Sequence, residues 1–227
     1  MFRTRIKICG VTRPADARAA AEAGADAIGL IFHHPAPRNV SLDQAREILG
    51  VLPAFVTAVG VFVNSPASEI LSIARGLGLR TVQLNGGENA ETIAALEELT
   101  VIKALRVRRE TLEADVAELK GQIARHHLVH LRAIVLEPGK TSAPGGTGVA
   151  NDWEIIRHKQ NEHLFAGLPA LIAAGGLTPQ NVGQVVRDVH PFAVDVSSGV
   201  EETPGEKSPA KIRAFVEAVR KSDESVR

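Results

Sequence analysis

The sequence predicts an α/β fold consisting of one single-domain (β/α)8 TIM barrel over residues 1–227. Three observations favour this fold. Short apolar runs alternate with amphipathic stretches along the whole chain, which is typical of parallel strands joined by helices. Eight such units fit in about 220 residues, close to the usual length of a closed barrel. No linker or low-complexity stretch divides the sequence into smaller domains.

The expected strands are eight apolar runs, at residues 5–9, 26–32, 56–63, 80–85, 100–106, 131–137, 168–173 and 191–196. The expected helices lie between them, at residues 14–24, 41–51, 66–77, 89–98, 110–120, 152–158, 179–188 and 208–220. An open, doubly wound sheet would show the same alternation, so the number of units is what favours closure. Residues 221–227 are expected to form a frayed tail.

Several expected helices begin with a capping signal. Ser41 and Gln44 have the spacing of a capping box. A hydroxyl residue precedes a proline, which suits the first helical turn, at Ser65–Pro66, Thr178–Pro179 and Ser208–Pro209.

Composition argues against several classes of function. The formal net charge is zero and the aromatic content is 4%, which does not fit a nucleic-acid-binding surface. The single cysteine rules out an internal disulfide and fits a reducing compartment. The N-terminal residues lack the apolar region of a signal peptide, and every apolar run is soon interrupted. We therefore expect a cytoplasmic protein without a membrane or nucleic-acid partner.

Alternation along the strands predicts which side chains face the barrel interior. In the first strand Ile6 and Ile8 suit the helix side, so Lys7 and Cys9 are expected to point inward. The same alternation turns inward Gln83 and Asn85, Val135 and Glu137, and Asp195 and Ser197. The inward side chains nearest the carboxyl ends of the strands lie where barrel enzymes build their active sites.

The thiol of Cys9 has a cation as its expected neighbour. Lys7 lies two residues away on the same face, at roughly 6.5–7 Å. A buried cation at this distance would favour the thiolate and make the sulfur a base or nucleophile. The alternative is that Cys9 is a small core residue, as buried cysteines often are.

Two glycine-rich loops predict a phosphate site. Gly175 and Gly176 follow the seventh strand, and Ser197, Ser198 and Gly199 follow the eighth. In this fold the loops after these two strands commonly bind phosphate through exposed backbone N–H groups. A third glycine-rich segment, residues 140–148 after the sixth strand, has the length of a lid or of a simple connection.

Eight segments of this sequence together resemble the phosphoribosylanthranilate isomerase family of tryptophan biosynthesis. They are "KICGVT", "GADAIGLIF", "PRNVS", "VGVFVN", "VQLNGGE", "PGGTG", "AGGLTPQNV" and "PFAVDVSSGVE". The resemblance covers residues 5–217 and implies a (β/α)8 barrel. It also implies an Amadori rearrangement, in which N-(5-phosphoribosyl)anthranilate becomes 1-(2-carboxyphenylamino)-1-deoxyribulose 5-phosphate. This is the third step of tryptophan synthesis from chorismate, and the family needs neither cofactor nor metal.

The resemblance also implies roles for individual residues. Cys9 matches the general base that removes the proton from C2′, and Glu137 stands where the family has its general acid. Arg38 matches the arginine that holds the anthranilate carboxylate, and Asp195 matches an aspartate near the base and the sugar. The remaining residues expected to bind the substrate are Lys7, Asn85, Gly175, Gly176, Ser197, Ser198 and Gly199.

The sequence departs from the family pattern near the expected mouth of the barrel. Glu137 replaces an aspartate, Asn85 a histidine, Asn39 an aromatic residue and Val149 a lysine. These departures leave two alternatives open: a weakened barrel that only binds a phosphosugar, and an isomerase of a related aminoribose phosphate. A cluster of His126, His127 and His130 precedes the sixth strand, at the opposite end of the barrel, and is expected to be solvated surface rather than a metal site. The oligomeric state is expected to be a monomer or a homodimer.

Overall fold

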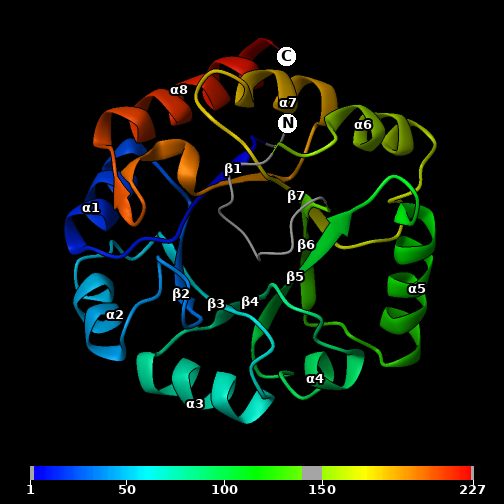
Figure 1. Cartoon of the computed structure of the whole chain (residues 1–227), viewed down its shortest axis with the longest axis horizontal. Helices are drawn as coiled ribbons and strands as arrows, with labels where there is room; N and C mark the ends of the chain where they lie inside the picture. The colour runs from blue at the N-terminus through cyan, green and yellow to red at the C-terminus, as the bar shows by residue number, and fades with distance from the viewer. Residues whose placement is uncertain (1–2, 140–149, 226–227) are drawn as a thin grey trace.

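The computed structural model describes residues 3–139 and 150–225. Eight parallel strands pair in sequence order and close into a barrel, and the helices form a ring around it (Figure 1). The strands are β1 (Arg5–Cys9), β2 (Ala27–Phe32), β3 (Thr57–Phe62), β4 (Thr81–Leu84), β5 (Thr100–Val107), β6 (Leu131–Pro138), β7 (Ala170–Ala174) and β8 (Ala193–Val196). The predicted fold class is confirmed, and an open sheet is excluded because β8 pairs with β1.

Every predicted helix is present, with shifted ends. The helices are α1 (Pro14–Ala23), α2 (Leu42–Leu49), α3 (Ala67–Leu77), α4 (Ala90–Ala94), α5 (Leu112–Arg125), α6 (Trp153–Asn161), α7 (Val182–Val189) and α8 (Pro209–Ser225). The capping box of Ser41 and Gln44 is confirmed. Ser208 accepts a hydrogen bond from the third residue of α8, whereas the side chain of Ser65 does not cap α3.

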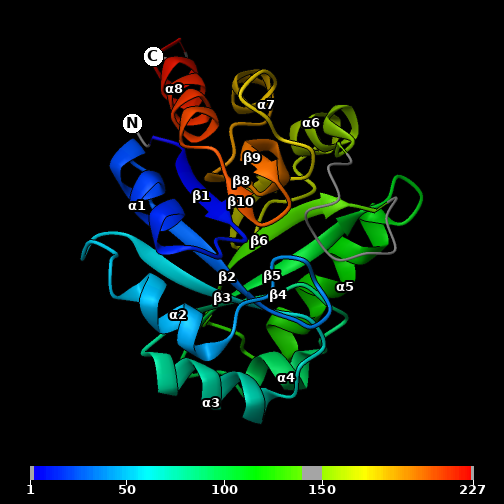
Figure 2. The same cartoon turned by 60° about the vertical axis from the view of Figure 1, so that its left-hand side comes forward.

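Three features of the C-terminal part were not predicted. A 3₁₀ turn, η1 (Ser198–Val200), follows β8, and a small antiparallel hairpin of β9 (Glu201–Thr203) and β10 (Glu206–Lys207) follows the turn. The hairpin lies near the carboxyl ends of β1 and β8, where Thr12 donates to the carbonyl of Gly205 (Figure 2).

The prediction of a frayed tail from residue 221 is wrong as far as Ser225, because α8 continues to that residue. Ser222 is buried and accepts from Arg187 of α7, and Asp223 accepts two hydrogen bonds from Thr4. In the ring, α8 lies between α7 and α1, so its last turns have packing partners that the local sequence does not reveal (Figure 1).

The apolar core has two layers, as the alternation predicted. Ile6, Ile8, Ile134 and Leu136 pack outward against the helices, in the larger cluster. The barrel interior is filled by a smaller cluster of Val59, Ile102, Ala133, Val135, Ile172, Ala174 and Ala193. These residues fill the barrel interior below the mouth, so the polar side chains at the strand ends pack on an apolar layer. No helix within the described ranges is both long and apolar enough to cross a membrane.

Candidate active site

A buried ion pair joins the first and eighth strands. Lys7 Nζ donates to Asp195 Oδ2 at 2.8 Å, and both side chains are almost fully buried. Burial lowers the pKa of Lys7, but the charges of Asp195 and Cys9 outweigh it and raise that pKa, so the lysine stays a cation. The other oxygen, Asp195 Oδ1, is buried and has no hydrogen-bond partner among the described residues. An unsatisfied buried acceptor of this kind favours a ligand hydroxyl beside it.

Cys9 ends β1 on the inward face, as predicted, and its residue is 8% exposed. Burial raises the pKa of the thiol, and the charge of Asp195 adds to this effect. Lys7 and Lys207 pull the pKa of the thiol down without overcoming burial. Lys7 thus favours the thiolate, as expected, but burial has the larger effect and the net shift raises the pKa of Cys9.

Gly29 of β2 makes room for this sulfur. It pairs with Cys9 in the parallel register, and its missing side chain leaves space that both polar groups of β1 occupy. A Cβ atom at residue 29 would lie 2.7 Å from Cys9 Sγ and 3.3 Å from Lys7 Nζ. A glycine is thus required at this place on the barrel wall, because any side chain would displace the thiol.

Glu137 points inward from the end of β6 and receives a hydrogen bond from across the mouth. Asn85 Nδ2 donates to Glu137 Oε1 at 3.0 Å, and Gln83 Nε2 donates to Asn85 Oδ1 at 2.8 Å. Burial raises the pKa of Glu137, and the negative charge of Asp195 raises it further. Arg106, Asn85 and Lys7 act in the opposite direction but do not cancel the rise. The net rise favours the protonated form of the carboxyl group, which is the form that can donate a proton.

Arg38, in the loop after β2, forms a two-point ion pair with Glu201. Its Nε and Nη2 donate to the two carboxylate oxygens at 2.8 and 2.7 Å. The same carboxylate accepts from Lys207 Nζ at 2.8 Å, and Lys207 also donates to the carbonyl of Ser197 at 3.1 Å. Two cations share one carboxylate here, so this buried cluster carries a net positive charge beside Cys9.

The two glycine loops meet, as a shared phosphate site requires. Gly175 and Gly176 have left-handed backbone, with φ of 98° and 62°. Ser198 and Gly199 begin and continue η1, and Gly199 packs so closely on the backbone of Leu177 that a Cβ atom would overlap its carbonyl oxygen. Sequence reasoning placed these loops near each other by analogy with the fold, and the structure brings them into contact.

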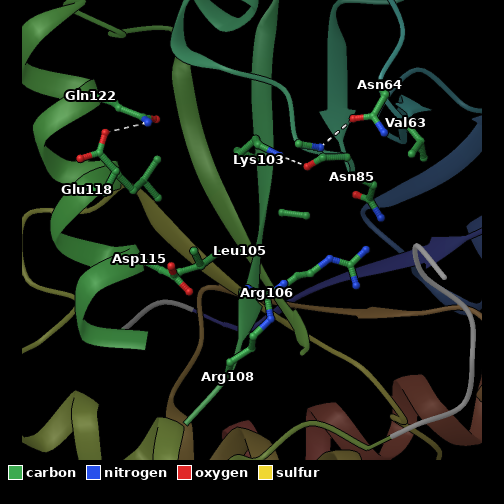
Figure 3. A pocket seen from close by; sticks show the side chains of 14 residues that line it. Val63, Asn64, Asn85, Lys103, Leu105, Arg106, Arg108, Asp115, Glu118 and Gln122 are labelled. Atoms are coloured by element: carbon green, nitrogen blue, oxygen red, sulfur yellow. Dashed lines mark hydrogen bonds between the residues drawn. The ribbon is translucent and has the colours of Figure 1, made fainter. Parts of the chain in front are cut away.

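A pocket of about 430 Å³ opens beside Asn85, between the ends of β3, β4 and β5 and helix α5. Figure 3 shows Arg106 of β5 extending away from α5, on the side of the pocket where Asn85 lies, with Asp115 and Glu118 on the helix opposite. In the barrel register Arg106 pairs with Glu137 of the next strand. The mouth therefore has a second arginine besides Arg38.

Sequence reasoning missed three residues of the site: Arg106, Glu201 as the partner of Arg38, and Lys207. Applying strand alternation to the fifth strand would have turned Arg106 inward, since Ile102 faces the interior four residues earlier. Nothing local signals Lys207, which reaches Ser197 only because the hairpin folds back over the eighth strand.

Two further expectations lie away from this site. His130 Nε2 donates to the carbonyl oxygen of Ile93 at 2.7 Å. No group of three metal-binding side chains occurs in residues 3–139 and 150–225. The expected lid at residues 140–148 and the departure at Val149 lie outside the described residues.

Comparison with known proteins agrees with this geometry. The family model described as N-(5'phosphoribosyl)anthranilate (PRA) isomerase matches residues 6–218. An N-(5'-phosphoribosyl)anthranilate isomerase of Pseudomonas aeruginosa (strain LESB58) is 45% identical over 220 residues, which is 97% of each chain.

Solved structures give the same answer. The phosphoribosyl anthranilate isomerase from Thermotoga maritima superposes with a TM-score of 0.82 at 36% identity, covering 96% of this chain and 99% of its own. A phosphoribosyl anthranilate isomerase in complex with reduced 1-(o-carboxyphenylamino)-1-deoxyribulose 5-phosphate has a TM-score of 0.79 at 35% identity, with the same coverage. On these grounds the chain belongs to the N-(5'-phosphoribosyl)anthranilate isomerase family.

Proposed function

We propose the residue roles by which this chain isomerises N-(5'-phosphoribosyl)anthranilate, the reaction for which its family is named. One observation supports these roles above all. Glu137, a buried carboxyl group with a raised pKa, and Cys9, a buried thiol, lie at the carboxyl ends of inward-facing strands, and both sense the charges of the Lys7–Asp195 pair. A proton donor and a proton acceptor at one mouth are what an Amadori rearrangement needs.

Glu137 acts first, as the general acid. It protonates the ring oxygen of the ribose, the ring opens, and the amino nitrogen forms a Schiff base at C1′. Burial keeps the proton on the carboxyl group at pH values where a solvated glutamate would have lost it. The open-chain Schiff base carries a positive charge, which makes the neighbouring C2′ proton acidic.

Cys9 acts next, as the general base. Its thiolate removes the proton from C2′ and gives an enolamine, which tautomerises to the ketone 1-(2-carboxyphenylamino)-1-deoxyribulose 5-phosphate. Lys7 and Lys207 favour the thiolate against the cost of burial, and the cationic Schiff base adds to them during the reaction. The ring-opening step thus creates the positive charge that stabilises the thiolate, and the next step uses that thiolate to remove the proton.

The substrate spans the mouth between the loops and the strand ends. Gly175, Gly176, Ser197, Ser198 and Gly199 bind the phosphate, with backbone N–H groups as the main donors. Asp195 Oδ1, which is buried without a partner in the described part of the chain, accepts from a hydroxyl of the sugar. Arg38 offers the anthranilate carboxylate the N–H groups that Glu201 does not use, since a guanidinium has five.

The decisive experiment is turnover of phosphoribosylanthranilate, followed by its fluorescence. The purified chain is expected to consume the substrate. Cys9→Ser is expected to lose at least about 100-fold in kcat while still binding the product, because a serine hydroxyl ionises far less readily than a thiol and so supplies almost no anionic base. Glu137→Gln should lose a similar factor in kcat.

Leu71 of α3 is partly buried and packs against the outer core, so the conservative variant Leu71→Ile serves as the matched control and should retain full activity. A wild-type chain that leaves the substrate unchanged at micromolar enzyme would rule out the isomerase and favour a barrel that only binds. Full activity in Cys9→Ser would clear the thiol of its role.

A homodimer is the oligomeric state that the surface favours. Three large apolar side chains are exposed at the N-terminal end of the barrel: Phe55 just before β3 at 97%, Val129 just before β6 at 78% and Phe192 just before β8 at 49%. A phosphoribosylanthranilate isomerase from Thermotoga maritima, solved in the form of generated monomers, is described as dimeric. The cytoplasm suits such an enzyme, because its free thiol must stay reduced.

A further inference from the structure

Two departures from the family pattern, Asn85 and Glu137, touch each other. They lie 52 residues apart in the sequence: Asn85 follows β4 and Glu137 is on β6, and β5 lies between these two strands. Their side chains meet at 3.0 Å, and Gln83 extends the chain of hydrogen bonds by one more amide. All three residues are at most 7% exposed. The amide of one strand end is therefore tied directly to the buried carboxyl group of another.

The direction of these hydrogen bonds fixes which oxygen of Glu137 carries its proton. Asn85 Oδ1 already accepts from Gln83, so the amide turns its N–H toward Glu137. In a protonated carboxyl group the carbonyl oxygen is a much better acceptor than the hydroxyl oxygen, so we assign Oε1, which accepts from Asn85, as the carbonyl oxygen. The transferable proton belongs to Oε2. Once the proton has left, the same N–H stabilises the carboxylate that remains.

Side-chain length explains why the two departures occur together. Glutamate reaches about an ångström farther than aspartate, by one methylene. The amide of asparagine reaches about an ångström less far than the distal nitrogen of histidine. We infer that Asn85 is a positioning residue for Glu137, and that this pair is a matched unit in which a longer acid meets a shorter donor than the aspartate and histidine of the family pattern. This inference rests on the proposed role of Glu137.

A double-mutant cycle tests the pairing. Glu137→Asp alone pulls the carboxyl group back from Asn85 and should lower kcat roughly 10-fold or more, since misplacing a catalytic group by about 1 Å is that costly. Asn85→His alone crowds the longer acid and should lower kcat by a similar factor. The double variant restores the separation and is expected within about threefold of the wild type, because neighbours in contact are not additive.

Two outcomes would contradict the matched pair. In one, the two losses multiply in the double variant, as they do for independent sites. In the other, Glu137→Asp by itself keeps or raises kcat, which would mean that the acid needs no partner at residue 85. The melting temperature of every variant is measured alongside, so that a loss of folding is not mistaken for a loss of positioning.

Asn85→Leu separates positioning of the acid from binding of the substrate. The leucine removes the N–H that lowers the pKa of Glu137, so the acid limb of the pH profile of kcat/KM should move to higher pH while KM changes less than about twofold. A direct substrate ligand would instead raise KM and leave the limb in place. Gln122→Leu is the matched control: its amide on α5 donates to Glu118 at 3.0 Å, and its loss should move neither quantity.

A measurement without substrate keeps this inference separate from the proposed function. The carboxyl carbons of the glutamates are labelled with ¹³C, and Glu137→Gln identifies the resonance of residue 137. Its titration should move to higher pH in Asn85→Leu and stay unchanged in Gln122→Leu. Absence of turnover in the wild-type chain would contradict the proposed function but not the positioning role. An unchanged titration of Glu137 in Asn85→Leu would contradict the positioning role but not the proposed function.

Discussion

At the scale of the residue, the state of Cys9 follows from competition between burial and charge. Lys7 and Lys207 both lower the pKa of the thiol, but burial of the sulfur raises that pKa by more than the two cations lower it. Burial likewise raises the pKa of the carboxyl group of Glu137. Under the proposed mechanism the reactive form has a thiolate and a protonated Glu137, so the raised pKa of Glu137 favours this form and the raised pKa of Cys9 opposes it.

This protonation pattern predicts a bell-shaped pH profile of kcat/KM. The fraction of reactive enzyme is constant between the pKa of Glu137 and the pKa of Cys9, and it falls outside them because both groups are then protonated or both ionised. Both pKa values are raised, so the acid limb is expected above pH 4.5 and the alkaline limb above pH 9.0.

Initial rates from pH 4 to 11, with a stability check at each pH, measure the two limbs. Lys7→Met removes the cation that lowers the pKa of Cys9, so its alkaline limb should move to still higher pH. An alkaline limb below pH 8 in the wild type would show a thiolate in the free enzyme and contradict the dominance of burial.

Alternation along the strands was enough to predict the facing of Lys7, Cys9, Glu137 and Asp195. It could not predict the sign of the pKa shift at Cys9, because that sign depends on how completely the surrounding barrel excludes water. Nor could it predict that Asn85 touches Glu137. Their contact crosses a third strand, and only the tilt and closure of the barrel determine that distance.

At the scale of the element, the β9–β10 hairpin supports the site from behind. Its two ends carry Glu201 and Lys207, which clamp Arg38 and the carbonyl of Ser197. Burial raises the pKa of Glu201, but hydrogen bonds from Arg38 and Lys207 outweigh it and lower that pKa, so the carboxylate stays charged. The hairpin thereby links the loop after β2 to the loop after β8.

Glu201→Ala should destabilise the protein by about 3–5 kcal/mol, because it leaves two buried cations without their carboxylate. Its neighbour Glu202 is exposed and forms an ion pair with Lys211, whose side chain is itself partly exposed. Glu202→Ala is therefore the matched control and should change stability little.

Urea denaturation followed by circular dichroism measures both variants. The KM of Glu201→Ala should also rise, since Arg38 loses its orientation. Equal midpoints for the two variants would contradict the importance of the buried cluster.

Elements with strong periodicity were predicted well, and the exceptions have local causes. The hairpin strands Glu201–Thr203 and Glu206–Lys207 are short and mostly charged, so they show no apolar alternation. Helix α7 begins at Val182 rather than 179, because Asn181 folds back to accept from the N–H of Thr178 and a turn comes first. Helix α8 continues to Ser225 because α1 and α7 pack against it.

At the scale of the whole molecule, the barrel has two ends with different chemistry. The carboxyl ends of the strands carry buried charges, whereas the N-terminal end exposes Phe55, Val129 and Phe192. The count of eight units predicted closure, and the structure confirms it through the pairing of β8 with β1. These exposed apolar residues could not be interpreted from the sequence, because they lie in short connections that do not show which residues are covered.

A homodimer formed through this N-terminal end predicts a simple result. Phe55→Glu places a charge in the apolar interface and should convert the dimer to a monomer of 24.1 kDa. Glu47→Gln on α2 is a control of similar size that should leave the dimer intact. Analytical ultracentrifugation over a range of concentrations measures both. A wild-type chain that sediments as a monomer at all concentrations would contradict the dimer.

The close packing of Gly29 against the sulfur of Cys9 affects how readily oxidants reach that sulfur. A buried thiol whose pKa is raised reacts slowly with peroxide and with alkylating compounds, since these attack the ionised and accessible form. Under the role proposed for Cys9, the sulfur is thus protected between turnovers and becomes reactive chiefly while a sugar is being converted.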